Sequence, residues 1–198
     1  MKSKILGFIL ILSSLYYILA EVFSAIYFKD TLISTYLFHT ISELGIPNIN
    51  SPLFWLMNSA FIIMGLALLF NNFYYFKNFI IKNKLPFYIL TLTTSIGVII
   101  VALIHGGNPF TLGYHMLGAM MAILGGNILL ILISKSMDVF KFYQKFSLIL
   151  GLIGLVVFWI MFFNMNNIYM PVFERISVYT LIIWNFLTGV FLLRNNFS

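Results

Sequence analysis

The chain has 198 residues, of which 62% are hydrophobic and only 8% are charged, and its mean hydropathy is +1.03. A soluble domain carries about 25% charged residues, so this composition excludes an ordinary water-soluble fold. The chain has no cysteine, which excludes disulfides and thiolate chemistry. The net charge of +6 does not indicate nucleic-acid binding, because the basic residues lie at the ends of apolar segments.

Apolar segments long enough to cross a bilayer recur along the chain. Each has roughly 18–24 residues, and at about 1.5 Å per residue such a helix spans the ~30 Å hydrocarbon core. The segments cover residues 5–28, 53–70, 86–104, 114–133, 146–163 and 172–193. We predict an all-α polytopic membrane protein, a single domain over residues 1–198 built as a bundle of six transmembrane helices.

The basic residues are distributed unevenly between the two sides of this predicted bundle. One side, which carries both termini, holds Lys2, Lys4, Lys77, Lys82, Lys84, Lys135, Lys141, Lys145 and Arg194. The other side holds only Lys29 and Arg175. Cytoplasmic loops carry an excess of Lys and Arg, so we predict a multi-pass protein of the cell membrane with both termini in the cytoplasm.

The remaining ionisable residues gather on the side opposite the termini. That outer side holds Glu21, Asp30, His39, Glu43, His105, His115 and Glu174, whereas Asp138 is the only acid on the cytoplasmic side. Membrane insertion imposes no comparably strong rule on acids and histidines. Their bias is therefore more informative about function than the bias of the lysines.

Three of these residues form the candidate catalytic set. His105 and His115 lie at the two ends of a polar turn over residues 104–115, so we expect them to approach each other. Imidazole and carboxylate groups serve as general acids and bases and also bind zinc and other divalent metals. We predict that Glu43, His105 and His115 line one outward-opening pocket and would be the ligands if a metal such as zinc binds. Their spacing matches no specific metal motif.

Further polar residues are predicted to contribute to ligand binding. They are His39, Ser42, Asn58, Glu174, Glu21 and Arg175. His39 and Glu43 have the i, i+4 spacing that places two side chains on one helical face. A carboxylate inside a span is costly without a partner, so Glu21 is either neutral or paired with Arg175. Structural roles remain open for the rest, since histidines suit a membrane interface and Glu174 is expected near a helix N-terminus.

One group of these residues resembles a known family. Ser42-Glu43-Leu44-Gly45, followed by Ser51-Pro52 and by Asn58 and Gly65 in the next span, resembles a prokaryotic membrane-protein family, domain-of-unknown-function family 998. His115 with Leu117-Gly118-Ala119 matches a second element of that family. The resemblance implies a six-helix membrane protein with functional weight on Ser42, Glu43, Asn58 and His115, and it implies no activity.

Three functions remain open on the sequence alone. The first is an outer-facing His/Glu site that binds or hydrolyses a lipid-derived or small polar ligand. The second is a non-catalytic structural membrane subunit. The third is a small transporter, which is disfavoured because the centres of the spans are nearly all apolar. We expect membrane lipids as partners, with homo-oligomers possible, and the sequence leaves open whether the protein is an enzyme.

Overall fold

A computed structural model describes residues 2–47, 51–137 and 141–194 of the chain. Within these residues the fold is entirely helical, without strands, and six helices are long and apolar enough to cross a membrane. They are α1 (Lys2–Ile26), α3 (Phe54–Phe70), α4 (Lys84–Leu103), α5 (Pro109–Ser136), α6 (Lys141–Phe163) and α7 (Met170–Arg194). The predicted all-α membrane bundle is thereby confirmed.

Short helical pieces complete the connections between the six spans. They are α2 (Leu32–Phe38), the 3₁₀-helix η1 (Ser42–Gly45), the π-helix η2 (Asn71–Tyr75) and the 3₁₀-helix η3 (Phe76–Asn78). Because η2 and η3 continue directly from α3, the second span extends to Asn78, beyond its predicted end at residue 70. Asp138, predicted on the cytoplasmic side, lies outside the described residues.

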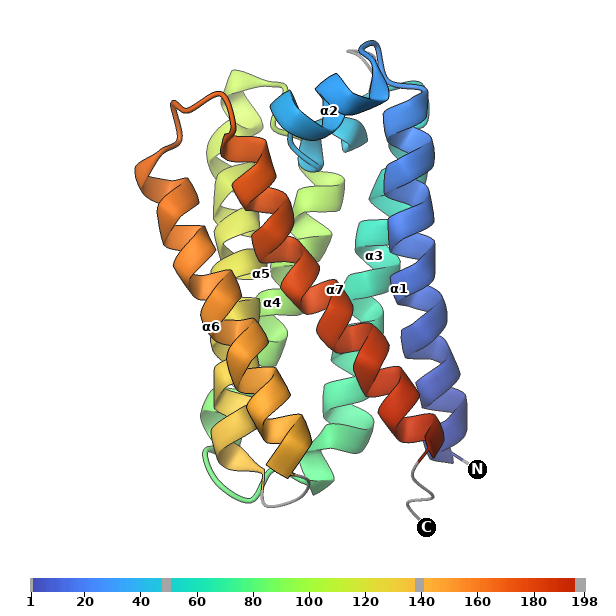
Figure 1. The fold of residues 1–198 in the computed structure, drawn as a ribbon, viewed down its shortest axis with the longest axis vertical. Coiled ribbons are helices and arrows are strands. Elements are labelled where there is room, and N and C mark those ends of the chain that lie inside the picture. The colour runs from blue at the N-terminus through green and yellow to red at the C-terminus, as the bar shows by residue number, and fades with distance from the viewer. Residues whose placement is uncertain (1, 48–50, 138–140, 195–198) are drawn as a thin grey trace.

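The six long helices pack as a closed ring in the order α1, α3, α4, α5, α6, α7, and α7 packs back onto α1. Figure 1 shows α2 at one end of this bundle and both termini at the opposite end. We call these the α2 end and the terminal end. Helix α7 crosses the bundle obliquely, from beside α6 at the α2 end to beside α1 at the terminal end (Figure 1).

Helix α5 begins five residues earlier than predicted. The Asn108 side chain accepts a hydrogen bond from the Phe110 amide, and Pro109 follows in the first helical turn. Proline fits this position because its fixed φ is helical and its missing N–H would be unpaired there in any case. The predicted polar turn over residues 104–115 is therefore shorter, and His115 lies inside the helix rather than at its entrance.

Close helix packing depends on small residues on the facing sides of α4 and α5. A Cβ atom added at Gly97 would lie 2.6 Å from the Ala122 nitrogen, and one added at Gly118 would lie 3.1 Å from the Gly97 carbonyl oxygen. Side chains larger than hydrogen would push the two helices apart. Small residues allow this approach in lipid, where van der Waals packing drives helix association.

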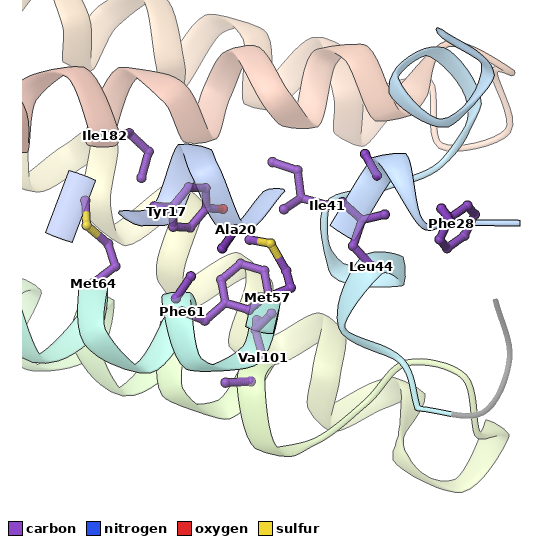
Figure 2. Packing of buried hydrophobic residues seen from close by; sticks show 13 residues of the cluster. Tyr17, Ala20, Phe28, Ile41, Leu44, Met57, Phe61, Met64, Val101 and Ile182 are labelled. Carbon is purple, nitrogen blue, oxygen red and sulfur yellow. The ribbon is translucent and has the colours of Figure 1, made fainter. Parts of the chain in front are cut away.

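The segment between α1 and α3 folds back onto the α2 end of the ring. Ile41 and Leu44 are fully buried there. Figure 2 shows both side chains between Phe28 and the core around Tyr17. The described part of this segment, residues 27–47 and 51–53, thus forms a cap over the bundle.

Candidate functional site

A buried ion pair fixes this cap to the membrane helices. The Arg175 Nε atom on α7 donates to Glu21 Oε1 on α1 at 2.9 Å, and both side chains are almost fully buried. The Tyr179 hydroxyl donates to the second Glu21 oxygen at 2.9 Å. Pairing and hydrogen bonding of this kind are required for a charge inside a membrane bundle. The Glu21–Arg175 pairing that the sequence allowed is therefore present.

The same arginine reaches the backbone of the cap. Its Nη1 atom donates to the His39 carbonyl at 2.6 Å and to the Tyr36 carbonyl at 3.1 Å, and its guanidinium lies 4.8 Å from the Tyr36 ring centre. Arg175 thus joins α7, α1 and the α2 segment. Its Nε and Nη1 atoms donate within the protein, whereas Nη2 has no hydrogen-bond partner among the described residues, and we call the Glu21–Arg175 pair the structural clamp.

The neighbouring acid, Glu174, has a different environment. Its side chain is 9% exposed, and its Oε2 atom accepts one hydrogen bond, at 2.9 Å, from the Ile41 amide of the cap. A buried carboxylate normally requires a charged or hydrogen-bonded partner. Among the described residues Glu174 has no ion pair, because the adjacent Arg175 faces Glu21.

Glu174 lies in the lining of two cavities. The first, the central cavity, lies inside the helix ring and extends from Ser42 and Glu174 at the α2 end to Leu130 and Trp184 deeper in the bundle. The second, the lateral cleft, lies between α5, α6 and α7 and is also lined by Ser42 and Glu174, together with Thr40 and His115. Their free volumes, counted out to their openings, are about 790 Å³ and 660 Å³.

His115 contributes a hydrogen-bond acceptor to the lateral cleft. The ring lies 7% exposed on α5, and its Nδ1 atom is 2.7 Å from the Ile104 carbonyl oxygen. A carbonyl oxygen only accepts, so Nδ1 carries the proton and the neutral ring keeps a lone pair on Nε2. Glu174, Ser42 and His115 together form what we call the polar wall.

His39 and Glu43 form a separate surface group. The His39 Nδ1 and Nε2 atoms each lie 2.7 Å from a carboxylate oxygen, of Glu43 and Asp30 respectively. Partial burial lowers the pKa of His39, but the hydrogen bonds to Glu43 and Asp30 outweigh it and raise the pKa above its ordinary value of 6.5. The predicted proximity of His39 and Glu43 is present, but neither side chain lines the central cavity or the lateral cleft.

His105 and Asn58 form a third, structural group. The Asn58 Nδ2 atom donates to the Gly45 carbonyl at 2.8 Å and to His105 Nε2 at 3.0 Å. Asn58 thereby joins the end of η1 to the connection between α4 and α5. Among the described residues His105 lines neither of the two cavities.

No hydrogen bond or ion pair among the described residues joins Glu43, His105 and His115 to one another, so their shared pocket stays a prediction. His115 faces the lateral cleft, whereas Glu43 binds His39 and His105 binds Asn58. No group of three or more His, Asp or Glu side chains in the described part of the chain could hold a metal ion.

The family model for "Protein of unknown function (DUF998)" matches residues 11–190, nearly the whole chain. The chain belongs to the DUF998 family. The family resemblance seen in the sequence is thereby confirmed, and it adds no activity. No curated protein and no solved structure matches the chain significantly.

Two features of this DUF998 chain were not predicted from the sequence. Tyr17 and Thr94 line the central cavity, and their buried hydroxyl groups have no hydrogen-bond partner among the described residues. Asn127, in the middle of α5, accepts from Thr180 at 2.7 Å and donates to Ser177 Oγ at 3.3 Å. The sequence offered only one signal for Asn127, an amide within an apolar run, and none that separates Tyr17 from the chain's ten other tyrosines.

Proposed function

We propose that this membrane protein binds a lipid-derived or small polar ligand at the polar wall, with the α2 end facing the outside of the cell. One observation carries the proposal: the nearly unpaired Glu174 carboxylate lies where the central cavity and the lateral cleft meet. An ionised carboxylate among apolar side chains costs stability unless it finds a partner. The Glu174 carboxylate is therefore well placed to bind a ligand that supplies a hydrogen-bond donor or a positive charge.

Binding is better supported than hydrolysis. Nucleophilic catalysis by Ser42 would need a base within hydrogen-bond reach. The Ser42 hydroxyl lies 3.2 Å from the Thr40 hydroxyl, within hydrogen-bond distance. Within the described residues no histidine hydrogen-bonds to Ser42, so a hydrolytic step has no geometric support here.

A binding assay with matched variants tests this proposal. The full-length protein in detergent is mixed with hexadecylamine, and the bound fraction is measured by native mass spectrometry. The Glu174→Gln substitution should weaken hexadecylamine binding more than about tenfold, because it removes the charge that pairs with the ligand. Glu43→Gln, which removes a carboxylate at the same end but outside both cavities, should leave binding unchanged. Equal binding by all three proteins would contradict the proposal.

The orientation of the bundle has its own test, which the natural absence of cysteine makes simple. Phe110 is 89% exposed near the start of α5, and Lys84 is exposed at the start of α4 on the terminal end. In intact cells an impermeant thiol reagent should label Phe110→Cys and leave Lys84→Cys unlabelled. The reverse labelling pattern would place the polar wall on the cytoplasmic side.

A further inference from the structure

We propose that the ligand is a single-chain lipid amine, with its ammonium group at the polar wall and its hydrocarbon chain in the central cavity. This inference rests on the proposed function and specifies its ligand class. It follows from three properties of the site: the hydrogen-bonding character of the wall, the shape of the central cavity and the side chains of the lateral cleft.

The polar wall is rich in acceptors. Glu174 offers a carboxylate with one backbone partner, and His115 offers the Nε2 lone pair. Neither cavity is lined by a Lys or Arg of the described chain, and the nearby Arg175 is held by Glu21. A phosphate or carboxylate headgroup would therefore meet like charge without a counter-ion. An ammonium group supplies three donors and the opposite charge.

The central cavity suits one hydrocarbon chain. Ten residues of α7 separate Glu174 from Trp184, which corresponds to about 15 Å along the helix axis. Between these residues the lining is almost entirely apolar, as Phe61, Val98 and Ala122 illustrate. A cavity with one polar end and an apolar interior matches a molecule with one polar end and one tail.

The unpartnered Tyr17 hydroxyl is a second and independent sign of a ligand. Tyr17 is 1% exposed and lines the same cavity as Glu174. Leaving a buried hydroxyl unpaired costs about 1–3 kcal/mol, so a ligand group that pairs with Tyr17 would gain binding energy. A ligand in the central cavity could therefore pair with Tyr17 as well as with Glu174.

The lateral cleft offers a route into this cavity from the surrounding lipid. Five of the chain's ten methionines line it: Met116, Met120, Met161, Met165 and Met170. Methionine side chains are flexible and adapt to apolar molecules of varied shape. The cleft and the central cavity share Ala119, Ile123, Ser42 and Glu174. A lipid amine that enters between α5 and α6 therefore meets the polar wall first.

The test measures binding as a function of chain length and headgroup. Hexylamine, dodecylamine and hexadecylamine are compared with hexadecanol and hexadecanoic acid on the full-length protein by native mass spectrometry. We expect dodecylamine, whose extended chain matches the length between Glu174 and Trp184, to bind better than hexylamine, and hexadecylamine to bind at least about tenfold better than hexadecanoic acid. Stronger binding of the acid than of the amine would overturn the headgroup assignment.

Substitutions in the central cavity test where the chain lies. Ala122→Leu and Val178→Phe add volume to residues that line the central cavity alone. Each should weaken hexadecylamine binding about tenfold while hexylamine binding is retained, because a shortened cavity excludes only long tails. Retained hexylamine binding also shows that the variant is folded. Leu130→Ala, which enlarges the deep end, should extend the range of accepted chain lengths.

A lipid-facing control separates cavity binding from partition into the detergent. Leu152 is 46% exposed on α6, so Leu152→Phe adds volume outside the cavity and should leave the chain-length profile unchanged. If Glu174→Gln weakens binding while the chain-length profile is identical in all cavity variants, the proposed function stands and the placement of the chain is wrong. If Glu174→Gln has no effect, the proposed function itself fails.

Discussion

Two adjacent residues of α7 show how differently this bundle treats buried charge. Arg175 and its partner Glu21 share a hydrogen bond of 2.9 Å, and the remaining polar atoms are largely taken up by Tyr179 and by cap carbonyls. Glu174 has one backbone donor and borders two cavities. Both carboxylates lie at the α2 end and both are buried.

The Glu21–Arg175 pair thus has a structural role, whereas Glu174 is available to a ligand. A buried, hydrogen-bonded ion pair specifies how elements meet, here how the cap docks on α1 and α7. A buried carboxylate without an ion pair contributes little to that docking beyond one hydrogen bond. Substitutions in the clamp should therefore change stability, and substitutions in the polar wall should change binding.

The largest expected effect on stability is that of Arg175→Leu. Removing the guanidinium leaves Glu21 as an uncompensated buried charge and frees two cap carbonyls. The cost should be about 3–5 kcal/mol. Thermal unfolding of the purified protein in detergent measures it.

The double variant Glu21→Leu with Arg175→Leu sharpens this prediction. It removes both charges, so it should recover part of the stability lost by Arg175→Leu alone. If the stability losses of the two single substitutions simply add in the double variant, the two side chains are not coupled, and the clamp interpretation fails.

A smaller effect is expected at Gly45, at the end of η1. A methyl group there would collide with the Asn58 amide oxygen, and the Asn58 side chain is held by its bonds to Gly45 and His105. Gly45→Ala should cost about 1–3 kcal/mol, the range typical of overpacking. The same unfolding assay applies.

Gly113→Ala provides the matched control. Gly113 lies in α5, and a Cβ atom added there meets no other atom within 4 Å. Alanine is the better helix former, so this variant should be neutral or more stable by up to about 1 kcal/mol. Equal destabilisation by the two substitutions would show that loss of glycine, rather than the collision with Asn58, is responsible.

The smallest effect is expected at His39, on the surface of the cap. Its raised pKa means that folding favours the protonated imidazole between Glu43 and Asp30. This stabilisation is complete below the ordinary pKa of 6.5 and is lost as the pH rises through the raised value. It should amount to less than about 1 kcal/mol, as for other solvated pairs.

Unfolding midpoints measured from acidic to mildly alkaline pH test this expectation. The natural protein should lose a little stability across that range, and His39→Gln should lose less. A midpoint that rises with pH in the natural protein and not in His39→Gln would mean that the sign of the His39 contribution is wrong.

Sequence patterns predicted the spans well because hydropathy over about 20 residues is a property of each segment alone. They also indicated Glu21 and Arg175 as partners, since a charge within a span requires one. The surroundings of the candidate site residues were only partly predictable, because some of their partners are close in sequence and others are distant. Glu43 finds His39 four residues away, and the Ile41 amide finds Glu174 across 133 positions of sequence.

The most direct test of the central claim is infrared difference spectroscopy of the full-length protein in lipid nanodiscs. Adding hexadecylamine should change a carboxyl band in the natural protein, because an ammonium group now pairs with the Glu174 carboxylate. The change should persist in Glu43→Gln and vanish in Glu174→Gln. If the same band change remains in Glu174→Gln, the amine does not bind at Glu174, and the polar wall is not the ligand site.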